Sequence, residues 1–199
     1  MRVKVCGLTR SGDVAAAVGA GVDAIGFVVW PQSPRAVTAS QVAALLRDVP
    51  PFITAVAVTV SPSTDDVCRL RDAGCGWVQV HGAVPVWPAG CSLLRAISWD
   101  PERRTWFPDD GGEDAVLVDA HDPVRHGGTG RAADWTHAAA LASRRAIVLA
   151  GGLTPETVEE AVQAVRPWAV DVSSGVEEAP GIKSAARIAA FVAAARRQA

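Results

Sequence analysis

The chain has 199 residues and a mass of 20.6 kDa; 49% of the residues are hydrophobic and 20% are charged. A chain of this length and composition forms one domain, or at most two small ones, and fills a sizeable core, so disordered and collagen-like classes are excluded. The 19 Lys and Arg residues do not outnumber the 21 Asp and Glu residues, and the formal net charge of −2 leaves no basic excess for binding a nucleic acid.

The cysteines and the apolar runs indicate the compartment. Four cysteines stand far apart without a C-x-x-C pair, which is typical of a reducing cytoplasm and argues against a disulfide scaffold or a zinc site. The four histidines are not at metal-ligand spacing. The first residues hold no apolar signal core, and the longest apolar run, residues 24–30, is too short to span a bilayer. We therefore expect a cytoplasmic protein without a metal site and without membrane contacts.

Short β-branched runs alternate with helix-like segments along the chain. In chain order, the pattern predicts strand 3–6, helix 11–20, strand 24–29, helix 39–47, strand 53–60, helix 63–73, strands 76–80, 93–97 and 115–119, helix 132–143, strand 146–149, helix 155–165, strand 169–172 and helix 184–197. Eight strands amount to about one per 25 residues, the repeat of a βα unit. The crossovers after the fourth and fifth strands carry prolines or are short, so their helices are expected to be a single turn or absent.

Strands that are apolar throughout, such as residues 146–149, predict a parallel sheet covered on both faces. Eight βα units close into a barrel. An open doubly wound sheet is expected to carry G-x-G-x-x-G after its first strand, but that loop reads CGLTR. The sequence therefore predicts one α/β domain over residues 1–199, a (βα)8 TIM barrel with weak or missing fourth and fifth helices.

The carboxyl ends of the strands in such a barrel meet at one rim, where the chemistry takes place. Gly151-Gly152 after the seventh strand and Ser173-Ser174-Gly175 after the eighth predict a phosphate site, because backbone N–H groups approach a phosphate closely at glycines and serines add hydroxyl donors. Either pair alone is equally typical of a turn. No lysine or arginine is adjacent, so mainly backbone contacts are expected. The glycines at 127–130 predict a lid after the sixth strand.

Cys6 and Asp119 end the first and sixth strands and so face the barrel mouth. A thiolate can remove a proton and a carboxylic acid can deliver one, and we expect nearby donors to favour the thiolate. The alternatives are an inert buried cysteine and an aspartate that caps a helix. Arg35 either grips an anion or is solvated. Lys4 and Asp171 lie one layer below the rim on neighbouring strands, where they are expected to pair.

Aromatic residues give a weaker signal. Trp30 and Trp135 lie in rim loops and can flank an aromatic ligand, whereas Trp77, Trp99 and Trp168 abut strands and are expected to pack between helices and sheet.

Short motifs then connect these positions to a known family. They are KVCGLTR at 4–10, GFV at 26–28, SPR at 33–35, QVHG at 79–82, VDA at 118–120, GGTG at 127–130, LAGGL at 149–153, DVSSGVE at 171–177 and PGIK at 180–183. These motifs follow one another in the order found in the phosphoribosylanthranilate isomerase family, barrel enzymes of tryptophan biosynthesis. The chain resembles this family over residues 3–183.

The resemblance implies an Amadori rearrangement of N-(5-phosphoribosyl)anthranilate to 1-(2-carboxyphenylamino)-1-deoxyribulose 5-phosphate, without a cofactor. It implies that Cys6 is the general base at sugar C2, that Asp119 is the general acid that opens the ring, and that Arg35 holds the anthranilate carboxylate. The other substrate-binding positions it implies are His81, Gly128, Gly151, Gly152, Ser173, Ser174 and Gly175. The expected partner is a small phosphorylated substrate, bound by a monomer or a homodimer.

Two other functions stay open. The sugar isomerase of histidine biosynthesis performs the same rearrangement but carries an aspartate where this chain has Cys6, and an enzyme that accepts both substrates is a variant of that alternative. A non-catalytic sugar-phosphate-binding barrel would keep the glycines and serines and lose the acid–base pair, of which both members are present here.

Overall fold

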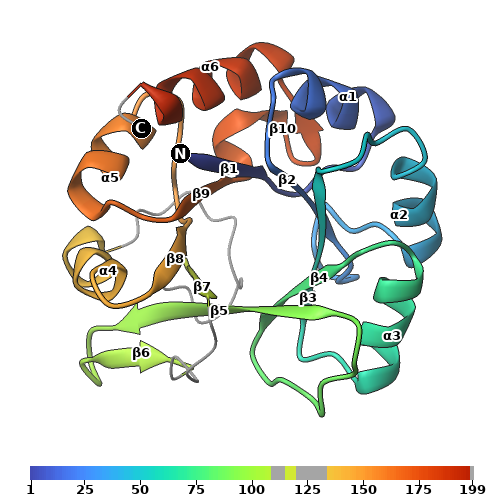
Figure 1. The fold of residues 1–199 in the computed structure, drawn as a ribbon, viewed down its shortest axis with the longest axis horizontal. Helices are drawn as coiled ribbons and strands as arrows, with labels where there is room; N and C mark the ends of the chain where they lie inside the picture. The colour runs from blue at the N-terminus through green and yellow to red at the C-terminus, as the bar shows by residue number, and fades with distance from the viewer. Residues whose placement is uncertain (109–114, 120–133, 198–199) are drawn as a thin grey trace.

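Eight parallel strands form a closed barrel in the computed structural model, which describes residues 1–108, 115–119 and 134–197. The strands are β1 (Arg2–Val5), β2 (Ala24–Val28), β3 (Thr54–Val60), β4 (Trp77–His81), β5 (Ser92–Asp100), β7 (Ala115–Val118), β8 (Ala146–Leu149) and β9 (Ala169–Val172). Their order is β4-β3-β2-β1-β9-β8-β7-β5, and a β4–β5 pairing closes the ring (Figure 1). The predicted barrel is confirmed.

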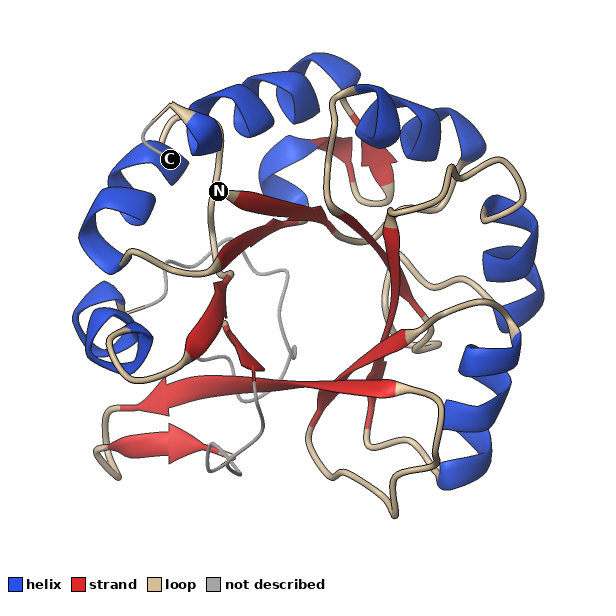
Figure 2. Cartoon of the chain, viewed as in Figure 1, coloured by secondary structure: helices blue, strands red, loops and turns tan. Residues whose placement is uncertain are grey.

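Helices form an outer layer around most of the ring (Figure 2). They are α1 (Ser11–Gly19), α2 (Ala39–Leu45), α3 (Thr64–Asp72), α4 (Trp135–Ala142), α5 (Val158–Val165) and α6 (Ala185–Arg196). Capping boxes at Thr38 and Ser63 fix the starts of α2 and α3 by satisfying free backbone donors. The start predicted for α5, at residue 155, is wrong: Thr154 and Thr157 hydrogen-bond to each other and hold residues 155–157 in a turn.

The two weak crossovers differ from the rest of the outer layer. No helix occurs between β4 and β5, nor among the described residues between β5 and β7, as predicted from the prolines after the fourth strand and the short segment after the fifth. Instead, β5 runs three residues beyond its expected end and pairs antiparallel with β6 (Thr105–Phe107). Asp100 forms the turn by accepting hydrogen bonds from the backbone N–H groups of Glu102 and Arg103. This hairpin was not predicted, because its second strand is only three residues long.

A second unpredicted hairpin follows β9. After the 3-10 turn η1 (Ser174–Val176), β10 (Glu177–Ala179) pairs antiparallel with β11 (Ile182–Lys183). Gly181 turns the chain with a φ of +79°, a left-handed conformation that side chains disfavour. The hairpin carries Lys183 back toward the barrel.

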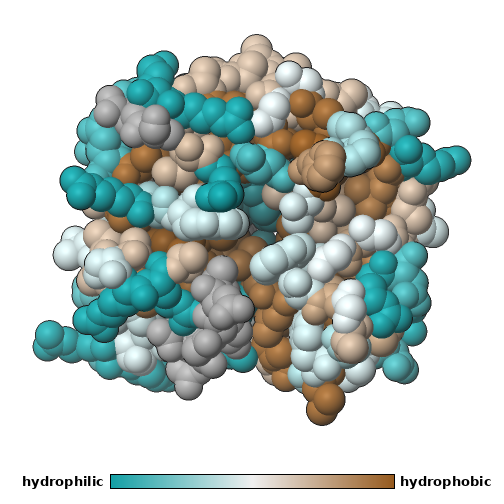
Figure 3. All heavy atoms as spheres, viewed as in Figure 1, coloured by the Kyte–Doolittle hydropathy of each residue, from teal (hydrophilic) through white to brown (hydrophobic). Residues whose placement is uncertain are grey.

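The core has two layers, because successive side chains of a strand point to opposite faces. Outward-facing residues such as Ile25, Phe27 and Ile147 pack with helix residues such as Phe191. Inward-facing residues form a smaller cluster within the barrel, composed of Leu94, Ala96, Leu117, Val148, Ala150 and Ala169. On the face seen in Figure 3, hydrophilic side chains gather mainly along the left and right sides, and hydrophobic ones lie mostly between them. Within the described residues, no helix is long and apolar enough to cross a membrane.

A buried ion pair closes the barrel interior between its first and last strands. The Lys4 Nζ lies 3.0 Å from the Asp171 Oδ1, and β1 and β9 pair these residues in register. Both are buried, at 4% and 7% exposed. Burial disfavours the charge on Lys4, but Asp171 and Cys6 together outweigh it and raise the pKa of the ammonium. The pairing predicted from strand register is confirmed.

We expect Lys4→Met to lower the free energy of unfolding by about 3–5 kcal/mol, because the Asp171 carboxylate then stays buried without its cation. Chemical denaturation measures the difference. Arg2→Met is the matched control: it removes a cation from an exposed position of the same strand, next to Trp168, where the cost is at most about 1 kcal/mol. An equal decrease in the free energy of unfolding in the two variants would show that the effect of Lys4→Met does not come from burial of the ion pair.

Candidate active site

A cavity of about 510 Å³ lies at the carboxyl ends of the barrel strands. Its wall contains nine of the ten residues predicted from the sequence: Cys6, Arg35, His81, Asp119, Gly151, Gly152, Ser173, Ser174 and Gly175. The tenth, Gly128, lies outside the described residues, as does the predicted lid. Residues that end or follow six different strands thus meet at one place, which is the arrangement of a barrel active site.

Cys6 and Asp119 enter the cavity from separate parts of the ring. Cys6 follows β1 and its N–H donates to the Val172 carbonyl oxygen, whereas Asp119 follows β7 and its N–H donates to the Ile97 carbonyl oxygen. These bonds extend the strand ladders by one residue on each strand and fix both backbones. The Cys6 thiol packs on Gly26 of β2, where an added Cβ would lie only 2.9 Å from the Sγ. A side chain at position 26 would therefore displace the thiol.

The charge state of Cys6 differs from the expectation. The residue is 6% exposed, and burial raises the pKa of its thiol above the ordinary value. Lys4, one layer below, and Lys183 act in the opposite direction through their positive charges, while Asp171 adds to the increase. Expecting a pKa lowered by nearby donors was therefore wrong for the protein without substrate, because desolvation outweighs the two lysines.

The predicted phosphate corner is built from two loops in contact. Gly151 and Gly152 have φ angles of +83° and +67°, and their N–H groups donate no hydrogen bond to another described residue. Gly175 packs so closely on the loop after β8 that an added Cβ would lie 1.9 Å from the Leu153 carbonyl oxygen. The glycines at both loops are thus required by close approach and by left-handed backbone.

The sequence predicted a phosphate corner without nearby cations, but the structure places two cations beside it. The Lys183 Nζ donates hydrogen bonds to the Ser173 carbonyl oxygen at 3.0 Å and to the Ser173 Oγ at 3.4 Å. Arg187 donates to the Gly175 carbonyl oxygen. Both cations lie within 15 residues of Ser173 in the sequence. They come close to the corner in space because the hairpin and the start of α6 fold back toward it, and spacing along the chain does not predict this.

A chain of hydrogen-bonded polar side chains leads from Lys4 to the wall of the cavity. The Lys4 Nζ donates to the Gln79 Oε1 at 3.1 Å, which leaves the Gln79 amide nitrogen to face the His81 Nε2 at 3.0 Å. Because an amide NH2 only donates, the His81 Nε2 accepts, and a neutral imidazole carries its proton on Nδ1. The sequence predicted no separate role for Gln79; its contact with His81 follows from its place one layer below the rim.

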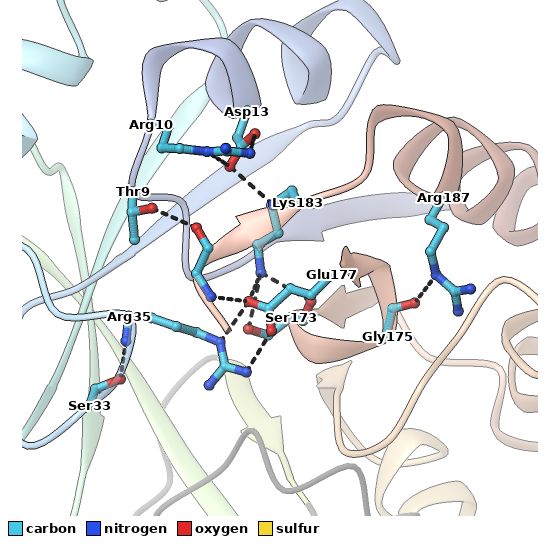
Figure 4. A network of polar contacts seen from close by, with 11 residues as sticks. Thr9, Arg10, Asp13, Ser33, Arg35, Ser173, Gly175, Glu177, Lys183 and Arg187 are labelled. Carbon is cyan, nitrogen blue, oxygen red and sulfur yellow. Dashed lines mark hydrogen bonds and ion pairs between the residues drawn. The ribbon is translucent and has the colours of Figure 1, made fainter. Parts of the chain in front are cut away.

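Arg35 is held by a partner that the sequence did not indicate. Its Nε and Nη2 donate to the two carboxylate oxygens of Glu177, each at 2.7 Å. Lys183 donates to the Glu177 Oε1 at 2.8 Å (Figure 4). Arg35 is therefore neither solvated nor unattached, although it still lines the cavity.

Of the two tryptophans proposed to flank a ligand, Trp30 lines the cavity and Trp135 packs partly buried against the core. Trp99 stacks on His137 with ring centroids 3.7 Å apart and meets Trp106 edge-on, so it packs as predicted. The same prediction is wrong for Trp168, which is 49% exposed with the Arg2 guanidinium over its ring. Within the described residues, no group of three or more His, Cys, Asp or Glu side chains is arranged to hold a metal ion.

Comparison with known proteins agrees with this geometry. A family model described as N-(5'phosphoribosyl)anthranilate (PRA) isomerase matches residues 3–194. A relative from Geobacter sp. (strain M21), named N-(5'-phosphoribosyl)anthranilate isomerase, is 43% identical over 98% of each chain. The chain belongs to the N-(5'-phosphoribosyl)anthranilate isomerase family. As a member, it is an isomerase of the aldose–ketose type that acts in tryptophan biosynthesis.

Two solved isomerases of this family share the fold. One, in complex with reduced 1-(o-carboxyphenylamino)-1-deoxyribulose 5-phosphate, is 31% identical with a TM-score of 0.82 and 98% coverage of both chains. The other, described as monomers generated from a dimeric isomerase of Thermotoga maritima, is 29% identical with a TM-score of 0.82 and the same coverage.

Proposed function

We propose that this isomerase converts N-(5-phosphoribosyl)anthranilate to 1-(2-carboxyphenylamino)-1-deoxyribulose 5-phosphate without a cofactor, with Asp119 as the acid and Cys6 as the base. Asp119 delivers a proton to the oxygen of the ribose ring, and the bond between this oxygen and C1 of the sugar breaks. The lone pair of the anthranilate nitrogen then forms a C=N bond to C1. The Cys6 thiolate then takes the C2 proton, and the electrons of that C–H bond neutralise the iminium as an enolamine.

Tautomerisation completes the reaction. A proton is added to C1 and the hydroxyl proton of C2 is lost, which leaves the ketone. Cys6, now a thiol, and Asp119, now a carboxylate, can donate and accept these protons, so the rearrangement returns both groups to their starting states. No net proton is consumed, and no redox partner is needed.

One observation carries the proposal: a thiol and a carboxyl group from different strands share one cavity with a glycine- and serine-lined corner. Phosphate at the corner of β8 and β9 places the sugar over the barrel mouth. Arg35 lines the same cavity and supplies a cation for the anthranilate carboxylate, and Trp30 supplies an aromatic face. His81 lines the same cavity and is proposed to contact the substrate.

The decisive experiment follows the loss of anthranilate fluorescence as the purified protein turns over the substrate. Isomerase activity supports the proposal; tight binding without turnover would instead indicate a sugar-phosphate-binding barrel. Parallel assays with the histidine-pathway substrate test the second alternative, for which Cys6 in place of an aspartate predicts a lower kcat/KM. A higher kcat/KM on that substrate would overturn the assignment.

Inorganic phosphate is expected to compete with the substrate, raising the apparent KM while leaving kcat unchanged. The physical reason is that the N–H groups of Gly152 and Ser174 are proposed to bind the phosphate group, so the free anion occupies the same corner. Initial rates at several phosphate concentrations and constant ionic strength measure this effect, with chloride as the control salt. A fall in kcat at saturating substrate would place the anion elsewhere.

We further propose that the enzyme acts in the cytoplasm as a monomer or homodimer, with a small phosphorylated substrate and neither nucleic acid nor membrane as partner. All four cysteines are free thiols, which supports a reducing compartment. Size-exclusion chromatography with light scattering decides between monomer and dimer.

A further inference from the structure

Glu177 is a buried carboxylate that joins two cations behind the wall of the cavity. Its Oε1 accepts hydrogen bonds from the Arg35 Nε at 2.7 Å, the Lys183 Nζ at 2.8 Å and the Gly181 N–H at 3.2 Å, and its Oε2 accepts from the Arg35 Nη2 at 2.7 Å. The Glu177 side chain is 5% exposed and that of Lys183 is 0% exposed. Figure 4 shows the three side chains converging from the loop after β2 and from the hairpin.

The contacts restrict where the Arg35 guanidinium can point. A two-point bond through Nε and Nη2 fixes the plane of the fork and turns its Nη1 edge away from Glu177. The Arg35 side chain also packs tightly on Gly7, which has a φ of +74°. A Cβ added at Gly7 would lie 2.6 Å from the Arg35 Cδ and 3.0 Å from the Ser173 Oγ. Arg35 lines the cavity and Glu177 does not, so only the arginine can touch a ligand.

The charges of the cluster do not cancel. Arg35 and Lys183 carry two positive charges and Glu177 one negative charge, so a net charge of +1 remains beside the cavity. Burial acts to raise the pKa of Glu177, but hydrogen bonds from the two cations lower it below the ordinary value, so the carboxylate is ionised at neutral pH. Two roles for Glu177 therefore make opposite predictions for a neutral residue at position 177. If Glu177 only balances charge, the neutral residue strengthens binding of a carboxylated ligand; if it fixes the direction of the Arg35 guanidinium, the neutral residue weakens that binding.

We propose that Glu177 is a positioning residue that aims the Arg35 guanidinium at the aromatic carboxylate, and that it thereby makes the site selective for an ortho-carboxylated phenylamino sugar phosphate. The proposal rests on the carboxylate-binding role of Arg35 in the proposed function. Lys183 bonds both Glu177 and Ser173, so the same contact fixes the distance between the carboxylate-binding arginine and the phosphate corner.

The test compares two ligands by titration calorimetry: reduced 1-(o-carboxyphenylamino)-1-deoxyribulose 5-phosphate and the same compound without the carboxyl group. The wild type is expected to bind the carboxylated ligand about 10- to 100-fold more tightly, the value of a hydrogen bond to a charged group. In Glu177→Gln and Glu177→Asp this ratio is expected to fall about tenfold, mainly through weaker binding of the carboxylated ligand. The glutamine is neutral, and the aspartate is one methylene too short for the same two-point bond.

Glu178→Gln is the matched control, because it removes the same charge from the next residue of β10 at an exposed position; its ratio stays at the wild-type value. A purely structural role for Glu177 would weaken both ligands equally and leave the ratio intact, which overturns the proposal. Tighter binding of the carboxylated ligand by Glu177→Gln would show charge balance instead and overturn it too.

The failures are distinguishable. A wild type that binds both ligands equally contradicts the role of Arg35 in the proposed function, and the inference about Glu177 with it. A wild type that prefers the carboxylated ligand, with the preference unchanged in both Glu177 variants, overturns only the role of Glu177. Ratios are measured on folded protein, and because the aspartate variant keeps the charge, it provides a second measurement if the glutamine variant is unstable.

Discussion

Cys6→Ser is expected to lower kcat by about 10²–10⁴-fold and to leave KM nearly unchanged, because a positioned base acts in the transition state and contributes little to substrate binding. Serine is close in size to cysteine, but its hydroxyl is a far weaker acid and supplies almost no anion at neutral pH. Steady-state kinetics by the fluorescence assay measure the loss. Near-full activity of this variant would refute the assignment of the base.

The other cysteines provide controls for the thiol chemistry. Cys68→Ser, Cys75→Ser and Cys91→Ser are expected to keep kcat near the wild-type value, since none of them lines the cavity. Cys75 is fully buried, and its burial raises the pKa of the thiol to about 12, so it is inert at neutral pH.

The pH profile follows from the sign of the shift at Cys6. The base must be a thiolate, and burial raises the pKa of the thiol, so the thiolate fraction rises with pH through neutrality and continues to rise above the ordinary pKa of cysteine. Because Asp119 must keep its proton to act as the acid, kcat/KM falls again once that proton is lost, and its pH dependence is expected to be bell-shaped. The rate of Cys6 alkylation by iodoacetamide, with Cys6→Ser as the blank, gives the same titration independently of turnover. A plateau below neutral pH would show that the lysines outweigh burial.

Asp119→Asn is expected to lower kcat by a similar factor of about 10²–10⁴, because an amide cannot deliver a proton to the ring oxygen. Asp119→Glu keeps the acid and displaces it by one methylene, so it retains a larger part of the activity. Asp65→Asn, at an exposed position of α3, is the control for the loss of one carboxylate and leaves kcat unchanged. Equal activity of the asparagine and wild-type enzymes would assign ring opening to another group.

The barrel was predictable because its signals are local. Apolar runs such as residues 146–149 indicate buried parallel strands, and two-residue periodicity placed Lys4 and Asp171 inward, below Cys6 and Ser173. The site residues were predictable for a similar reason, because the residues that follow the parallel strands of a barrel all lie at one rim.

The remaining features depend on contacts that no local pattern encodes. Glu177 stands 142 positions from Arg35, and its partner is set by a hairpin whose strands are three and two residues long. The raised pKa of Cys6 depends on how completely the folded barrel excludes water from the thiol. The pairing of β5 with β6 depends on the Asp100 turn, because prolines and a short segment only indicate that a helix is missing.

The ion pair between Lys4 and Asp171 joins residues 167 positions apart, and the bond from Thr9 to the Gly181 carbonyl oxygen spans 172. Contacts of such long sequence separation form late in folding, because the entropy of closing a loop of that length must be overcome before they stabilise anything. The pairing of β1 with β9 joins the first and last strands of the barrel, and beside it lie the phosphate corner and the Arg35 cluster. A substrate that binds only when this seam is closed stabilises the folded state, so we expect bound substrate to slow unfolding.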